Sequence, residues 1–130
     1  KDAVKELTKG QGADVIYDPV GGDLFDQAVR SINWKGRLLV VGFASGRIPE
    51  FPANLALLKG SSIVGVFWGS FAAREPQANL ENFQQLFAWF SEGKLKPLVS
   101  LTYKLDQYED ALEVLSSRKA VGKVVVKVRD

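Results

Sequence analysis

Three apolar segments that run into glycine constrain the fold of this chain more than any other feature of its sequence. They span 14–18, 37–43 and 61–68, and glycine closes or follows each one. The second holds four consecutive aliphatic residues at 38–41. Such a continuous run is typical of a strand buried on both faces, as in a parallel sheet covered by helices.

Segments with helical spacing of apolar residues lie between and after these strands. We expect helices over 2–9, 23–36, 54–59 and 76–92. Asp23 is placed to cap the second of them. The longest carries an apolar stripe that we assign to the core rather than to a cofactor site, formed by Leu80, Phe83, Phe87 and Phe90.

The pattern changes after a glycine-to-proline break at 93–97. Leu101, Tyr103 and Leu105 alternate with polar residues, as in a strand with one solvated face. Asp106 and Glu109 have the spacing of a capping box before a further helix, and a last strand covers 123–128. The order of elements predicts an α/β fold, a partial doubly wound parallel sheet with a C-terminal strand–helix–strand tail.

Composition excludes several functions. The 130 residues include 17 Lys and Arg and 15 Asp and Glu, which gives a net charge of +2. Because the net charge is small and the basic residues are scattered, the composition does not favour a nucleic-acid partner. No apolar run is long enough to span a membrane, and the N-terminus lacks the pattern of a signal peptide. Without Cys or His the chain offers no thiolate, no imidazole and no metal site built from them. We assign it no catalytic residue.

The segments after the strands are the candidate site, because ligands of open parallel sheets bind beyond the carboxyl ends of the strands. Glycine in 19–22, 42–46 and 67–70 lets main chain approach a flat ligand closely. Exposed backbone N–H and C=O groups there could bind a carboxamide. The alternative is that these glycines only turn the chain and the aromatic residues fill a core. Asp14 and Asp18 are better explained as capping or solvated residues than as paired catalytic carboxylates.

Five segments together resemble the zinc-free quinone oxidoreductase branch of the medium-chain dehydrogenase/reductase family. They are 12–22 (GADVIYDPVGG), 36–46 (GRLLVVGFASG), 64–69 (VGVFWG), 108–112 (YEDAL) and 122–126 (GKVVV). The resemblance covers essentially the whole chain. It implies a C-terminal fragment of a longer protein, with residues 1–97 as the second half of a Rossmann domain. Residues 98–130 would be a tail that packs on a GroES-like catalytic domain.

The resemblance also implies a nicotinamide cofactor, NADP with NAD not excluded, and no metal. The residues it assigns to cofactor binding are Val20, Gly22, Gly42, Phe43, Ala44, Val66, Phe67, Trp68, Gly122 and Lys123. Hydride would pass from the nicotinamide to a quinone or another electron-poor small molecule. Catalysis would then consist mainly of positioning the two reactants.

The same resemblance implies a cytoplasmic, homodimeric parent in which the strand at 61–68 pairs across the dimer, and a fragment that is inactive alone. A non-catalytic α/β interaction module remains the alternative. A methyltransferase that uses S-adenosylmethionine is disfavoured, because two strand ends follow the dehydrogenase patterns at 42–46 and 65–69.

Overall fold

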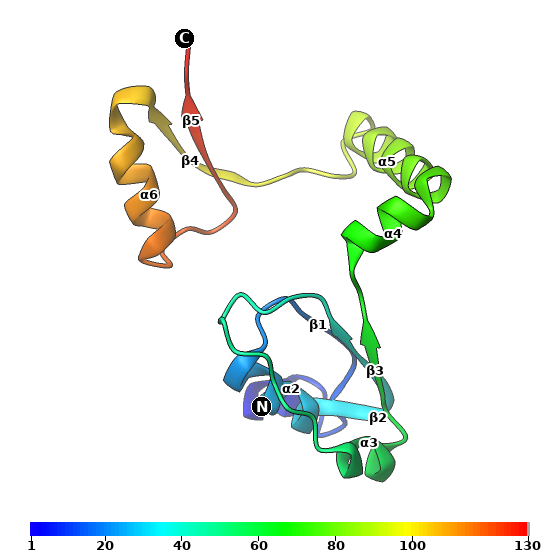
Figure 1. Cartoon of the computed structure of the whole chain (residues 1–130). Helices are drawn as coiled ribbons and strands as arrows, with labels where there is room; N and C mark the ends of the chain where they lie inside the picture. Colours follow the sequence, from blue (N-terminus) through cyan, green and yellow to red (C-terminus); the bar gives the residue numbers. More distant parts are fainter. Residues whose placement is uncertain (130) are drawn as a thin grey trace. The chain divides into compact units, whose positions relative to one another are not determined.

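The chain forms two compact units, Lys1–Pro76 and the residues from Gln77 onward, in a computed structural model that describes residues 1–129. Each unit contains its own small parallel sheet (Figure 1). The fold is mixed α/β with parallel strands, as the order of elements predicts.

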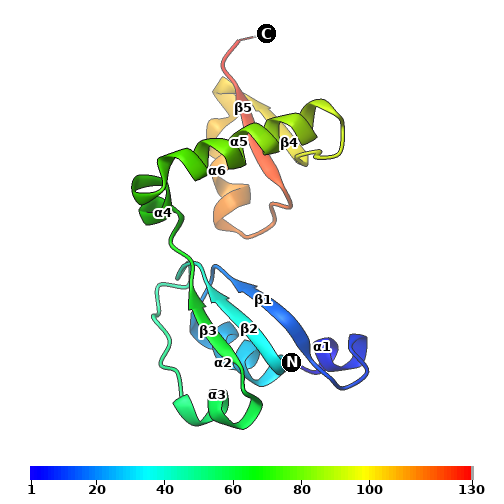
Figure 2. The same ribbon diagram turned by 90° about the vertical axis from the view of Figure 1, so that its right-hand side faces the viewer.

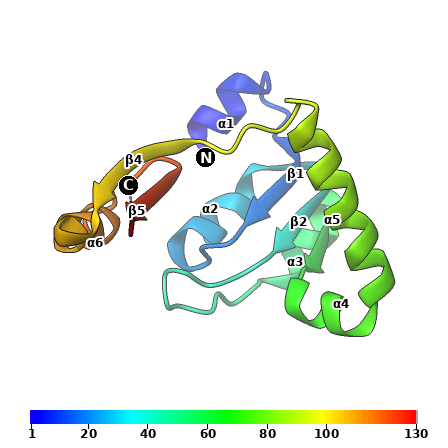
Figure 3. The same cartoon turned by 90° about the horizontal axis from the view of Figure 1, so that it is seen from above.

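The first unit is built on a three-stranded parallel sheet with strand order β1-β2-β3. Its strands are β1 (Ala13–Asp18), β2 (Ile32–Val40) and β3 (Ser62–Gly65), and its helices are α1 (Asp2–Leu7), α2 (Gly22–Ser31), α3 (Ala53–Lys59) and α4 (Trp68–Arg74). The helices α2 and α3 pack against the strands (Figure 2, Figure 3). Both helices lie on the same face, because residues of α2 and α3 pack into one core cluster with alternate residues of the strands.

The core of this unit lies between that face of the sheet and the two helices. It consists of buried Phe25, Val29, Ile32 and Leu38, with Ile16, Ala28, Val40, Phe51, Leu55 and Ile63 packed around them. The rings of Phe25 and Phe51 meet edge to face at 6.3 Å between centroids. The other face of the sheet is open, and Tyr17 on it is 65% exposed. Within this unit one face of β2 is covered by helices, and the prediction that both faces are covered stays a prediction.

The helix α5 (Pro76–Ser91) begins at the last residue of the first unit and otherwise belongs to the second. The second unit also holds β4 (Val99–Lys104), the 3₁₀ turn η1 (Leu105–Gln107), α6 (Tyr108–Ser116) and β5 (Lys123–Lys127). The strands β4 and β5 pair in parallel, and α6 crosses between them, with Ala111 buried against the sheet (Figure 1). The aromatic stripe of α5 is exposed within this unit, and its assignment to a core stays a prediction. Its Phe83 and Phe87 rings stack on each other at 6.2 Å, and both side chains are exposed.

Several predicted element boundaries differ from those in the structure. The N-cap of α2 is Gly21 rather than Asp23, and the helix ends at Ser31, because Ile32 starts β2. The third predicted strand ends at Gly65, and Trp68 begins α4. No Asp106–Glu109 capping box forms. Instead, Gln107 Oε1 accepts the N–H of Lys104 at 3.1 Å and closes η1.

Candidate functional site

The carboxyl ends of β1, β2 and β3 lie side by side at one edge of the first sheet (Figure 2). Asp18 pairs with Val40, and Val40 pairs with Gly65, so the three strands end in register. The segments 19–22, 42–46 and 66–68 therefore leave the sheet at the same edge, as the sequence predicts. This is the edge at which open α/β sheets bind ligands.

Asp18 fixes the turn that follows β1. Its side chain is buried, and Oδ1 accepts the N–H groups of Val20 and Gly21, both at 2.9 Å. Asp14, at the other end of β1, accepts the side-chain N–H of Asn33 at 2.7 Å. The two carboxylates are not a catalytic pair, and the sequence-based preference for a capping role of Asp18 is confirmed.

Backbone hydrogen bonds join the loop after β1 to the loop after β2. Ala44 N–H donates to Pro19 O at 3.1 Å, and Ser45 N–H donates to Val20 O at 3.0 Å. A Cβ atom on Gly42 would lie 3.3 Å from the carbonyl oxygen of Pro19. A side chain at Gly42 would therefore push the two loops slightly apart.

Gly21 and Gly22, at the start of α2, leave space for the loop that follows β2, called the second loop below. Gly21 has φ +68° and ψ −149°, and a Cβ atom there would lie 3.0 Å from Cδ1 of Phe43. Gly22 has φ +58°, and its Cβ would lie 2.7 Å from the hydroxyl oxygen of Ser45. Both positions have a positive φ that favours glycine, and a side chain at either one would also require the second loop to shift.

A hollow opens where β2 and β3 diverge. The last backbone hydrogen bond between them runs from Val66 N–H to Val40 O at 2.8 Å. Beyond it, seven residues line a space of about 600 Å³, which we call the strand-end hollow: Val40, Val41, Gly42, Phe43, Gly65, Val66 and Phe67. Phe67 is 77% exposed and Phe43 is 40% exposed, so neither side chain is buried in the core.

Four of the residues predicted to bind a cofactor line the strand-end hollow, namely Gly42, Phe43, Val66 and Phe67. Val20, Gly22 and Ala44 belong to the adjoining loops. Trp68 lines a neighbouring hollow of about 440 Å³ together with Phe67 and Phe71.

The remaining two, Gly122 and Lys123, belong to the second unit. There the N–H of Lys123 donates to Leu98 O at 2.7 Å, and a Cβ on Gly122 would lie 2.6 Å from that same oxygen. Their assignment to the cofactor stays a prediction.

Sequence reasoning missed Arg47, which ties the second loop to α2. Its Nη2 lies 2.9 Å from Asp23 Oδ1 and 3.0 Å from Asp26 Oδ2. The hydrogen bond to Asp26 and the negative charges of both carboxylates raise the pKa of Arg47 above its ordinary value. The one sequence feature that points to Arg47 is its position directly after Gly46, which ends the candidate segment 42–46.

Lys59, the last residue of α3, binds carbonyl oxygens at the C-terminal end of α2. Its Nζ donates to the carbonyl oxygens of Ile32 at 2.6 Å and Arg30 at 3.3 Å. Partial burial, with a smaller contribution from the positive charge of Lys5, lowers the pKa of Lys59 below its ordinary 10.5.

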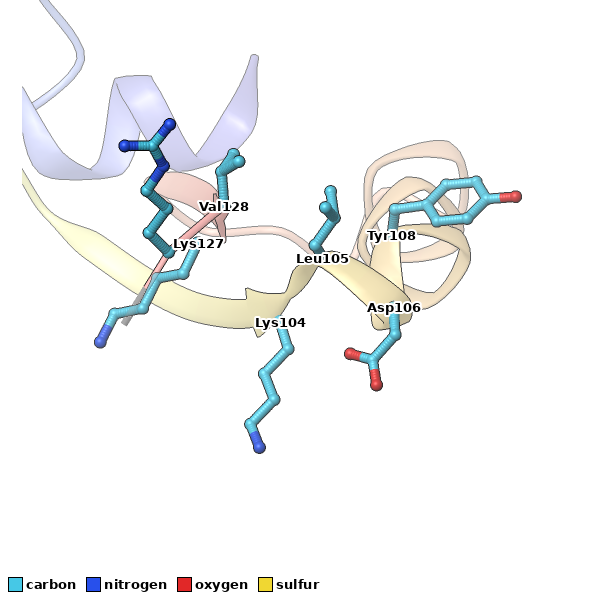
Figure 4. A pocket seen from close by; sticks show the side chains of 7 residues that line it. Lys104, Leu105, Asp106, Tyr108, Lys127 and Val128 are labelled. Carbon is cyan, nitrogen blue, oxygen red and sulfur yellow. The ribbon is translucent and has the colours of Figure 1, made fainter.

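A separate hollow of about 680 Å³ lies in the second unit, at the carboxyl ends of β4 and β5 (Figure 4). Lys104 and Lys127 are paired in register there, and Asp106 lies beside Lys104. Within residues 1–129, no three His, Cys, Asp or Glu side chains gather where they could hold a metal ion. No helix in the same range is long and apolar enough to cross a membrane.

Comparison with known proteins shows which family of proteins this fold belongs to. The family model described as "Zinc-binding dehydrogenase" matches residues 1–126. The chain therefore belongs to the zinc-binding dehydrogenase family. This result confirms the family resemblance seen in the sequence motifs.

Individual relatives agree with the family. The chain is 45% identical over 130 residues to "Quinone oxidoreductase-like protein 2 homolog" of Nematostella vectensis, covering 99% of this chain and 36% of that protein. It is 36% identical over 129 residues to "Quinone oxidoreductase-like protein 2" of Bos taurus, covering 99% and 37%. The chain thus spans little more than a third of the length of these relatives.

Solved structures confirm the fold. A mycobacterial protein complexed with NADPH has a TM-score of 0.79 and 28% identity, covering 96% of this chain and 39% of that one. A probable oxidoreductase from Mycobacterium abscessus has a TM-score of 0.73 and 34% identity, covering 96% and 36%. The predicted α/β, Rossmann-like fold class is confirmed by these neighbours.

Proposed function

We propose that this chain is the C-terminal part of an NAD(P)H-dependent oxidoreductase, called the parent polypeptide below. The parent transfers hydride from the nicotinamide to a quinone or another electron-poor small molecule, without zinc. The observation that carries this proposal is the strand-end hollow, where glycine-bearing main chain lies between the exposed rings of Phe43 and Phe67. The quinone oxidoreductase-like relatives and the NADPH-bound structural neighbour support it.

The residues of the strand-end hollow fit the nicotinamide half of such a cofactor. No side chain fills the space above Gly65, where a Cβ would meet nothing within 4 Å. Because Val66 N–H is already bonded to Val40, Val66 can offer a carboxamide only its carbonyl oxygen. We assign Gly42, Phe43 and Ala44 to the ribose and ring, and Phe67 and Trp68 to the carboxamide and the acceptor side.

The bound nicotinamide would supply the hydride. The chain's own contribution is to hold the ring flat against glycine and to exclude water with the two aromatic side chains, so that donor and acceptor meet in reactive contact. The proton that completes the reduction would come from solvent. In this scheme the 130 residues provide orientation rather than a general acid or base.

Cofactor choice, assembly and location are further parts of the proposal. We propose NADPH as the preferred cofactor, with NADH as the alternative, and a cytoplasmic homodimer. The dimer would form through β3, which is the outer strand of its sheet and has its second edge unpaired among the described residues.

Filling the hollow tests the proposed site. In the parent polypeptide, Gly65→Leu would place a branched side chain in the strand-end hollow, and we expect NADPH affinity to fall at least about tenfold, the effect of losing roughly 1.4 kcal/mol. Gly65→Ala should lower affinity less. Ser62→Leu, at the opposite end of β3, is the matched control and should bind NADPH like the wild type. Fluorescence of the reduced nicotinamide reports binding.

The outcomes separate the candidate functions. Unchanged NADPH affinity in Gly65→Leu would refute the assignment of the hollow. A folded parent polypeptide that binds neither NADPH nor NADH would refute the oxidoreductase function and leave the non-catalytic α/β module. Binding followed by reduction of 1,4-benzoquinone, with unchanged turnover after treatment with a zinc chelator, is the result that we expect.

A further inference from the structure

Arg47 connects the loop after β2 to the N-terminal half of α2 through both its side chain and its backbone. The guanidinium Nη2 bridges Asp23 and Asp26 at 2.9 and 3.0 Å. The carbonyl oxygen of Arg47 accepts the N–H of Gly22 at 3.2 Å. These contacts join the two loops of the site at their outer end.

The loop held by Arg47 carries Phe43 and Ser45. Gly46 N–H donates to Phe43 O at 2.8 Å, which closes the loop into a tight turn just before Arg47. The hydroxyl of Ser45 contacts the N–H of Arg47 at 3.3 Å, and the Phe43 ring lies over Gly21. A shift of Arg47 would therefore move the aromatic wall of the strand-end hollow.

We infer that Arg47 is a positioning residue, which sets the orientation of Phe43 and the width of the strand-end hollow by clamping the loop to Asp23 and Asp26. This inference rests on the proposed function, because it assigns the hollow to the nicotinamide. Arg47 itself touches none of the reacting atoms. Its role is to hold the loop after β2, which carries Phe43 into the proposed nicotinamide site.

A purely structural ion pair is the competing explanation. The side chains of Arg47 and Asp23 are 48% and 94% exposed, and exposed ion pairs contribute little to the free energy of unfolding. The two explanations therefore differ in what they predict. If Arg47 only forms an exposed ion pair, its removal changes both the free energy of unfolding and the strand-end hollow little. If it positions the loop, its removal changes the hollow more than it changes stability.

Hydrogen exchange in the parent polypeptide without nucleotide tests the clamp directly. In Arg47→Ala, the amides of Ala44 and Ser45 should exchange about tenfold faster, because local opening of the loop becomes easier. Arg47→Lys keeps the charge and should restore part of the protection. Arg30→Ala, on the same helix, removes a guanidinium that donates to the Asp26 carbonyl oxygen and not to the loop after β2, and it should leave these amides unchanged.

Steady-state kinetics supplies the second readout. With NADPH and 1,4-benzoquinone, Arg47→Ala should lower kcat about tenfold through misplacement of the nicotinamide. Affinity for adenosine 2′,5′-bisphosphate, which lacks the nicotinamide, should not change. Equal exchange rates and equal kcat in wild type and Arg47→Ala would overturn the inference. Failure of the wild type to bind NADPH would instead refute the proposed function, and the exchange rates would still decide the clamp.

Discussion

At the scale of single residues, Gly21 shows how backbone conformation and packing act together. Its φ of +68° and ψ of −149° lie in a region that is essentially restricted to glycine. The Phe43 ring and the carbonyl oxygen of Arg47 occupy the space on its open side, at 3.0 and 3.1 Å from a built Cβ. A side chain at Gly21 would thus disturb both loops of the site.

Gly21→Ala should lower the free energy of unfolding of the parent polypeptide by about 2–3 kcal/mol, since backbone strain and steric conflict add. Gly46→Ala is the control, because Gly46 also has a positive φ of +81° but nothing within 4 Å of its Cβ position. Its cost should be only about 1 kcal/mol. Urea denaturation measures both. Equal losses would show that packing around Gly21 contributes nothing.

Lys59 should titrate below its ordinary pKa of 10.5, because burial disfavours the charged ammonium. Between the lowered pKa and 10.5, the unfolded chain binds more protons at Lys59 than the folded chain does. The contribution of Lys59 to stability should therefore increase as the pH rises through this window. NMR titration of the Lys59 side chain measures the pKa, and Lys59→Met should abolish this part of the pH dependence. A midpoint at or above 10.5 would contradict the prediction.

At the scale of elements, the turn from β1 to α2 depends on one buried carboxylate. Asp18→Ala would leave the amides of Val20 and Gly21 without their acceptor, and should cost about 2–3 kcal/mol. Asp18→Asn retains a side-chain oxygen at the same place and should cost less than half of that. Thermal and urea unfolding of the parent polypeptide compare the two. An equal loss in both variants would mean that the charge, rather than the acceptor, matters.

The elements that sequence reasoning predicted well are those with strong local periodicity. The apolar strand around Leu38 and the helices α3 and α5 lie where their patterns indicate. Boundaries decided by tertiary contacts were missed. Ile32 fits the apolar face of α2, but it starts β2 and is buried in the core, and Asn33–Gly36 form an irregular insertion where the register with β1 shifts.

The site was partly predictable for the same reason. Glycine after each strand is a local signal, and it located the edge that holds the strand-end hollow. The clamp at Arg47 was not predictable, because its carboxylate partners lie 24 and 21 residues earlier in the chain. The aromatic stripe of α5 was assigned to a core because its spacing is amphipathic, yet spacing does not identify the surface that would cover it.

At the scale of the whole molecule, the first unit leaves one face of its sheet open. Tyr17, Leu39 and Val64 are paired in register across that face, and Tyr17 and Val64 are exposed. An exposed apolar sheet with an unpaired outer strand favours association. The 130-residue chain by itself should therefore form oligomers and bind a hydrophobic dye.

Light scattering and dye fluorescence measure this behaviour. Lysine substitutions at Tyr17 and Val64 together should lower both signals, whereas Lys9→Ala, at an exposed position remote in sequence from β3, should not. A stable monomer without dye binding would contradict the prediction.

The unreversed order β1-β2-β3 also bears on how this unit is made on the ribosome. Each new strand joins the outer side of the strand synthesised just before it, so no later segment has to insert between two strands already in place. The sheet can therefore grow in the order of translation, with α2 and then α3 completing each step as it emerges.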